Sequence, residues 1–195
     1  KESLEDLRDQ LRELGSDLFE ANDSAHEVFG KLREQIGASA IYCEQIEAPE
    51  ELGQVASLSE SGLQVNTIWQ SSMLNPQSLP FSPQEMPDIF TQFRQQVEKK
   101  KLRFTEPMQA PQKIPPLPIH DLSAFKLSDQ NDALKGGIFQ GGERSANSHI
   151  KQYFERRLPD TYKQTRNQLI GLDYSSKFSP LLASGCCSAR SIAKR

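Results

Sequence analysis

The chain has 195 residues, 25% of them charged, and its formal net charge is −3 at pH 7. This length allows one large or two small domains with a real core. Because there is no basic surplus, general attraction to nucleic acid is excluded, and any such contact must come from a local patch. The longest apolar runs are too short to span a bilayer and no signal-peptide pattern opens the chain, so we expect a soluble, cytoplasmic protein.

The sequence offers no pattern of a disulfide framework, a metal site or a familiar catalytic motif. Cys43 and the adjacent pair Cys186 and Cys187 fit neither disulfide nor zinc spacing, and we expect small buried side chains in a reducing compartment. No P-loop, dinucleotide-binding glycine motif or nucleophile elbow is present. The three histidines are scattered, and we expect surface or hydrogen-bonded positions for each: His26, His120 and His149.

Leucines at three- and four-residue steps predict a first helix with one apolar stripe: Leu4, Leu7, Leu11 and Leu14. Gly15 ends this helix. The charges opposite the stripe are interpreted as an ordinary solvated face: Glu2, Glu5, Asp9, Arg12 and Glu13. A weak strand is expected over Asp17–Glu20.

The next two elements are a capped helix and an apolar strand. Ser24 and Glu27 have the spacing of a capping box, which predicts a second amphipathic helix closed at Gly37. The run Ala38–Cys43 is continuously small or apolar, as is typical of a strand buried on both faces.

A third helix opens at Pro49, with acidic residues in its first turn, and stops at Gly62. Leu63–Trp69 follows as another apolar strand. Short strands alternating with helices predict βαβ units and a parallel sheet. Because the chain begins on a helix, we expect it to lack the first strand or strands of such a sheet.

The middle of the chain is rich in proline. Ser71–Pro87 is expected to be a polar loop, and Pro87 opens a helix over Asp88–Lys99. The lysine run Lys99–Lys101 is interpreted as a solvated helix end rather than a phosphate-binding patch. Pro107–Pro118 is predicted to be a semi-rigid extended linker, which marks a domain boundary.

The last third begins with an irregular segment, Asp121–Gln140, followed by a helix over about Ser145–Arg157 that ends at Pro159. Further on, a hydroxyl cluster precedes an apolar run, Leu181–Cys187, that is expected to form a buried helix. Its members are Tyr174, Ser175, Ser176 and Ser179. Hydroxyls at a helix start suit an anion, and Lys177 adds a full charge. On chemistry alone, N-capping is the favoured role of Ser175 and Ser176.

Three segments carry a more specific pattern. They are YSSKFSP at 174–180 followed by LASGC at 182–186, IWQSSMLNPQSLPF followed by MPDIFTQFRQQVEK, and GGE at 141–143. Together they resemble the photolyase/cryptochrome family, and within it the DASH-type cryptochromes, over nearly the whole chain. Leu181 and Ala189 depart from the tryptophan and proline that are usual there, and neither change removes a flavin donor.

The resemblance implies a flavin adenine dinucleotide (FAD) held in a helical C-terminal domain. The segment that would bind its diphosphate and ribityl oxygens consists of Ser175, Ser176, Lys177, Phe178 and Ser179. Phe178 would act through its backbone, and Tyr162 matches a tyrosine that packs against the flavin. Arg166 matches a basic position near the DNA-facing rim, where a surface salt bridge is an equally good interpretation.

The family also carries an antenna folate, methenyltetrahydrofolate, at the edge of its α/β domain. A carboxylate after the strand matching 41–43 binds the pterin ring, which makes Glu47 the candidate, with Glu50 behind it. The usual pattern places the acidic residue one position earlier than Glu47.

The implied fold is an α/β, parallel-sheet, Rossmann-like antenna domain over 1–104, lacking its first strands. A proline-rich connector follows over 105–140, and residues 141–195 are the start of an all-α FAD-binding domain. In the family the residues that contact the flavin ring and the DNA lesion lie beyond Arg195. We therefore expect an internal fragment that repairs nothing by itself.

The resemblance implies a parent protein that splits cyclobutane pyrimidine dimers, preferably in single-stranded DNA, by blue-light-driven electron transfer from reduced FAD. No membrane or metal is implied. A blue-light photoreceptor without repair activity is the alternative, and a nucleotide-binding α/β module of the universal-stress type is a third interpretation. The missing glycine-rich turn counts against the third.

Overall fold

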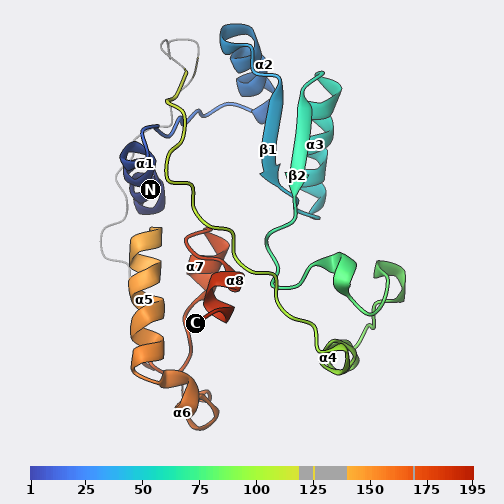
Figure 1. Ribbon diagram of the computed structural model, residues 1–195, viewed down its shortest axis with the longest axis vertical. Helices are drawn as coiled ribbons and strands as arrows, with labels where there is room; N and C mark the ends of the chain where they lie inside the picture. The colour runs from blue at the N-terminus through green and yellow to red at the C-terminus, as the bar shows by residue number, and fades with distance from the viewer. Residues whose placement is uncertain (119–124, 126–139, 169) are drawn as a thin grey trace.

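The computed structural model describes residues 1–118, 125, 140–168 and 170–195 (Figure 1). Its elements within these ranges are α1 (Glu2–Glu13), α2 (Ala25–Ile36), β1 (Ala40–Glu44), α3 (Pro49–Glu60), β2 (Gln64–Ile68), the 3-10 turns η1 (Pro76–Ser78) and η2 (Pro83–Glu85), α4 (Phe90–Lys100), α5 (Glu143–Glu155), α6 (Leu158–Thr165), α7 (Ser179–Ala183) and α8 (Ala189–Ala193).

A βαβ unit forms the upper part of the molecule in Figure 1. β1 and β2 pair in parallel, in a register that runs from Ala40 opposite Gln64 to Glu44 opposite Ile68, and α3 connects them. The capping box of Ser24 and Glu27 opens α2, and Gly37 closes it, as expected. The predicted parallel pairing of these strands is therefore confirmed.

The core of this unit covers one face of the strand pair. Ile41 of β1, Leu58 of α3 and Leu63 are buried together, with Phe29 of α2 packed against them. Tyr42 is 72% exposed because alternate strand residues point to opposite faces. The expectation that this strand is buried on both faces is wrong for the part of the chain that the structure describes.

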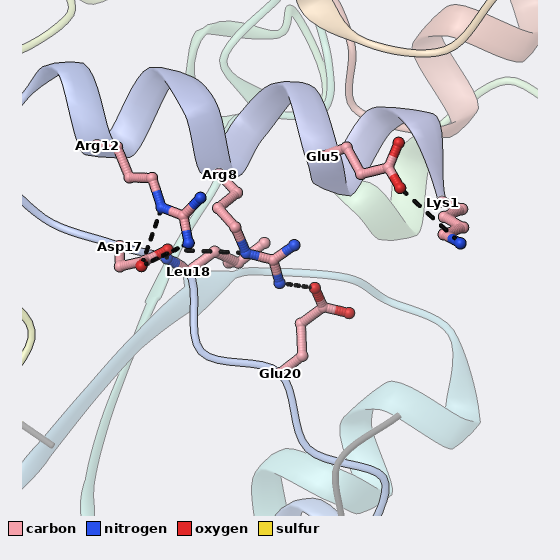
Figure 2. Close-up of polar contacts among 7 residues, drawn as sticks. All are labelled: Lys1, Glu5, Arg8, Arg12, Asp17, Leu18 and Glu20. Atoms are coloured by element: carbon pink, nitrogen blue, oxygen red, sulfur yellow. Dashed lines mark hydrogen bonds and ion pairs between the residues drawn. The ribbon is translucent and has the colours of Figure 1, made fainter. Parts of the chain in front are cut away.

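The segment Asp17–Glu20 is not a strand; the expectation was wrong (Figure 2). Its polar groups are held by α1 instead: Asp17 pairs with Arg12 at 3.1 Å, and Glu20 pairs with Arg8. The Asp17 carboxylate also accepts a bond from the Leu18 N–H at 2.7 Å. Side chains that bond locally in this way compete with a strand ladder.

A second core surrounds α5. Its buried residues come from α5 and from the C-terminal segment: Ala146, Ile150, Tyr153, Phe178, Leu181 and Cys186. α1 lies against α5 (Figure 1), although no residue of α1 is buried. Leu4 and Leu7 of its apolar stripe are exposed, so the stripe does not enter a core.

Two of the charges on α1 are exposed, as expected for a solvated face, and they also bond to the start of α5. Glu2 accepts a bond from the Gly141 N–H at 2.7 Å, and Glu13 pairs with Arg144 at 2.5 Å. Asp6 accepts bonds from the N–H groups of Glu143 and Arg144, at 2.7 and 3.3 Å. α1 therefore caps a helix that begins more than 130 residues later in the sequence.

Several helix boundaries differ from the sequence prediction. α4 begins at Phe90 rather than Asp88. α5 ends at Glu155, and Pro159, expected to stop it, lies in the first turn of α6. The run Leu181–Cys187 is not one helix, because α7 ends at Ala183 and a separate α8 begins at Ala189.

Arg190 of α8 ties the C-terminal segment to the chain after β2. Its guanidinium donates bonds to the carbonyl oxygens of Ser72 and Trp69, at 3.0 and 3.3 Å. Lys194 adds an ion pair with Glu106 at 2.8 Å.

The remaining expectations fall on loops and cysteines. Residues 102–118 contain no helix or strand, and the loop Ser71–Pro87 carries only η1 and η2. All three cysteines are free thiols, and Cys186 is buried. The segment Asp121–Gln140, apart from Phe125 and Gln140, and His120 lie outside the described residues.

Two features are absent from the described residues. None of their helices combines the length and the apolar character that crossing a membrane requires. Within the same ranges, no three His, Cys, Asp or Glu side chains gather into a set that could hold a metal ion.

Candidate functional site

The hydroxyl-rich segment Asp173–Ser179 follows α6 and ends on Ser179, the first residue of α7, and it is held by α5 and the C-cap residue of that helix. Arg156 donates two bonds to the carboxylate of Asp173, at 2.8 and 2.5 Å. His149 bonds through Nε2 to the carbonyl oxygen of Ser176 at 2.8 Å. Since a carbonyl can only accept, the imidazole N–H is the donor. We call residues 173–179 the hydroxyl loop.

Phe178 is the buried anchor of the hydroxyl loop. Its ring lies 5.1 Å from the Tyr153 ring and 5.8 Å from the His149 ring, both in edge-to-face contact. Such pairs favour a defined ring position beyond simple burial. Phe178 therefore fixes the end of the loop against the core, at the point where the loop meets α7.

The backbone of the hydroxyl loop turns sharply at Lys177, which has φ +56°, a left-handed conformation. Phe178 follows in the right-handed region, as the N-cap of α7. A left-handed residue next to a right-handed one points successive N–H groups toward one concave spot that suits an anion. The interpretation of Ser175 and Ser176 as N-caps is wrong, because no side chain caps α7.

Gly171 permits the entry into the loop. It has φ +129°, and a Cβ atom there would lie 2.6 Å from the ring of Tyr174, so no other residue fits without a shift. The pKa of Asp173 is lowered by its hydrogen bonds from Arg156, which favours the ionised pair.

Four of the candidate FAD-binding side chains have no polar partner among the described residues. Ser175, Ser176 and Lys177 are partly buried, whereas Ser179 is exposed. Within the described part of the chain, none of these four side chains makes a hydrogen bond or an ion pair. Three hydroxyl donors and one ammonium group thus remain available for an anionic ligand.

Tyr162 and Arg166 lie on the neighbouring helix α6. They are four residues apart, so they share a face, and the Arg166 N–H bonds to the Tyr162 carbonyl at 2.9 Å. Both side chains are exposed. Burial raises the pKa of Tyr153, and the nearby Tyr162 adds to the shift.

The candidate antenna residues are placed elsewhere, beside the βαβ unit. Glu47 follows β1 and accepts a bond from the Gln45 amide at 2.6 Å, and Glu50 is in the first turn of α3. Both are exposed. The same unit has a groove of about 360 Å³, but neither glutamate lines it. The lining residues are His26, Gly30, Arg33, Glu34, Ser61 and Leu63.

Sequence reasoning missed the residues that support the hydroxyl loop. His149 was expected to be merely on the surface or satisfied, and Arg156 was not singled out. His149 is indeed hydrogen-bonded, but its acceptor is the loop itself. The spacing of His149, Tyr153 and Arg156, at four and three residues, would have placed them on one helix face.

Comparisons with known proteins identify the family and support the fold. The sequence model of the family described as DNA photolyase matches residues 1–113, more than half of the chain. The chain therefore belongs to the DNA photolyase family.

The chain is also similar to individual proteins of one branch of that family. The proteins named cryptochrome DASH from Gloeobacter violaceus and Xenopus laevis are each 37% identical to this chain and cover 98% of it. The chain in turn spans 40% and 39% of the length of these two relatives.

Solved structures show the same architecture. The crystal structure of Synechocystis cryptochrome matches 99% of this chain with a TM-score of 0.80 at 34% identity, over 42% of its own chain. A class III photolyase from Agrobacterium tumefaciens matches 98% of this chain with a TM-score of 0.79 at 18% identity, over 41% of its own chain. The latter likeness supports the fold alone.

Proposed function

We propose that the natural protein carrying this sequence is a flavin-dependent, blue-light-driven DNA photolyase of the cryptochrome DASH type. It splits cyclobutane pyrimidine dimers, preferably in single-stranded DNA, where moving the lesion out of the stack costs less. Residues 1–104 form the antenna domain, 105–140 the connector, and 141–195 the start of the FAD-binding domain.

The observation that supports this proposal best is the hydroxyl loop. Its motif resembles the family's flavin-diphosphate segment, and its donors fit a diphosphate. Ser175, Ser176 and Ser179 offer hydroxyls without protein acceptors in the described part of the chain, and Lys177 offers a charge. The left-handed turn at Lys177 also directs backbone N–H groups toward one side.

In this proposal the candidate residues of the chain bind and orient the cofactor. Ser175 and Ser176 donate hydrogen bonds to phosphate oxygens, Lys177 neutralises their charge, and Phe178 contributes its backbone N–H. Tyr162 packs against the flavin from α6. Bound there, reduced FAD supplies the electron that splits the dimer under blue light and then recovers it.

Two further contacts belong to the same proposal. Arg166, exposed four residues after Tyr162, contacts the DNA backbone at the rim of the site. Glu47 and Glu50, exposed after β1 and at the start of α3, bind the pterin ring of methenyltetrahydrofolate.

A light-dependent repair assay tests this function. The natural protein is reduced, mixed with single-stranded DNA that contains a cyclobutane thymine dimer, and kept in blue light or in darkness. We expect the ultraviolet absorbance of the thymine bases to return only in the light. Bound flavin without repair would favour the photoreceptor alternative, and a protein without flavin would refute the proposal.

A further inference from the structure

The hydroxyl loop is supported at three points by one face of α5. His149, Tyr153 and Arg156 follow one another at four- and three-residue steps, so their side chains leave the helix on the same side. They contact, respectively, the carbonyl of Ser176, the ring of Phe178 and the carboxylate of Asp173. At these three points the hydroxyl loop is therefore held by contacts from α5.

The bond from His149 fixes the orientation of one peptide plane. In a trans peptide the carbonyl of one residue and the N–H of the next point in opposite directions. The Ser176 carbonyl points to His149 on α5, so the N–H of Lys177 points away from α5. This is the N–H that opens the left-handed turn at Lys177.

Arg156 fixes the other end of the loop. Its two parallel bonds to Asp173, at 2.8 and 2.5 Å, hold both the position and the plane of the carboxylate. Both side chains are about half exposed, so the pair adds little to global stability. The pair instead restricts the conformational freedom of the loop between residues 173 and 176.

We propose that His149 and Arg156 are positioning residues for flavin binding. They hold the hydroxyl loop in its binding conformation before the ligand arrives, which lowers the ordering cost of binding. This inference rests on the proposed function of the loop, and it assigns to α5 a role that the loop motif alone does not contain.

The test uses the natural protein without flavin and three variants. His149→Ala removes the donor, His149→Gln keeps an N–H donor at similar reach, and Arg156→Gln removes the bidentate pair. Arg157→Gln is the matched control, because Arg157 is 82% exposed and pairs with Asp160 three residues on, within the same turn. Hydrogen exchange of the amides over 172–179 and the dissociation constant of added FAD are measured.

We expect His149→Ala to speed amide exchange in the loop and to weaken FAD binding about fivefold, the range of one neutral hydrogen bond. His149→Gln restores most of both. Arg156→Gln weakens binding about two- to threefold, because its pair is partly screened by solvent. Arg157→Gln changes neither quantity.

Unchanged loop exchange in both His149→Ala and Arg156→Gln would overturn the inference, as would faster exchange with unchanged FAD affinity. Exchange that rises equally over the whole protein would also count against it, since that indicates global destabilisation. If the unsubstituted protein binds no FAD, the proposed function fails and the flavin-positioning role fails with it, and the exchange data then test only whether α5 holds the loop.

Discussion

The cap that α1 provides for α5 gives a prediction whose size follows from the structure. Asp6 is 14% exposed, and its Oδ2 atom accepts bonds from two backbone N–H groups at the start of α5, at 2.7 and 3.3 Å. Asp6→Ala leaves both donors without this acceptor. Losing a cap costs about 0.5–2 kcal/mol, and losing the charge at a helix start costs about 0.3–1 kcal/mol more.

Alanine has a higher helix propensity than aspartate, which offsets up to about 0.7 kcal/mol of this loss of stability within α1. We therefore expect Asp6→Ala to lower the free energy of unfolding by about 1–2 kcal/mol, and Asp6→Asn, which keeps an acceptor oxygen, by about half as much. The matched control is Asp9→Ala, since Asp9 is exposed on the same helix. That control loses no cap and should be neutral or slightly stabilising.

Urea unfolding followed by circular dichroism measures these differences, and amide exchange at Glu143 and Arg144 locates them. In Asp6→Ala the two amides should exchange faster than those in the middle of α5. Equal stability of the Asp6→Ala and Asp9→Ala variants would refute the capping argument.

Two further predictions concern the same junction and the hydroxyl loop. Gly142→Ala should destabilise by about 2–4 kcal/mol, because Gly142 has φ +101° and a Cβ atom there would lie 2.8 Å from Asp6. Gly53→Ala, in the helical interior of α3 with open space around it, should instead stabilise by about 0.5–1 kcal/mol, and equal effects in urea unfolding would contradict the reasoning. Nuclear magnetic resonance titration of Asp173 should give a pKa below the ordinary 3.8 that rises toward it in Arg156→Gln. Because the folded-state pKa is the lower one, the pair stabilises above the ordinary pKa and loses its effect as the pH falls through the folded-state pKa.

Local signals in the sequence predicted much of the α/β part. The capping box of Ser24 and Glu27, the proline and acids that open α3, and the small or apolar run that becomes β1 each act within a few residues. The burial of β1 could not be predicted in the same way. An apolar run does not say which face neighbouring elements will cover, and Tyr42 lies on a face that the described residues leave open.

Other errors came from signals with two meanings. Pro159 was interpreted as a helix stop, but proline is also common in the first turn, and here it opens α6. The glycine at position 185 has φ +71° and separates α7 from α8, which divides the apolar run Leu181–Cys187.

The support of the candidate site depends on contacts that no local pattern contains. His149 meets its acceptor 27 residues later, and Asp6 meets the N–H of Glu143 across 137 residues. Within its own helix, neither residue had a spacing or neighbour that indicated such a contact. The motif around Ser175 identified the loop, but only the tertiary structure identified what holds it.

The central claim is that the hydroxyl loop binds the diphosphate of FAD. Its most direct test is the affinity of the flavin-free natural protein for FAD and for riboflavin, which lacks phosphate, with and without Ser175→Ala and Ser176→Ala. We predict that the double variant binds FAD at least about 100-fold more weakly, as expected for the loss of two bonds to a charged group, and binds riboflavin unchanged. An equal loss for both ligands, or no loss for FAD, would contradict the account.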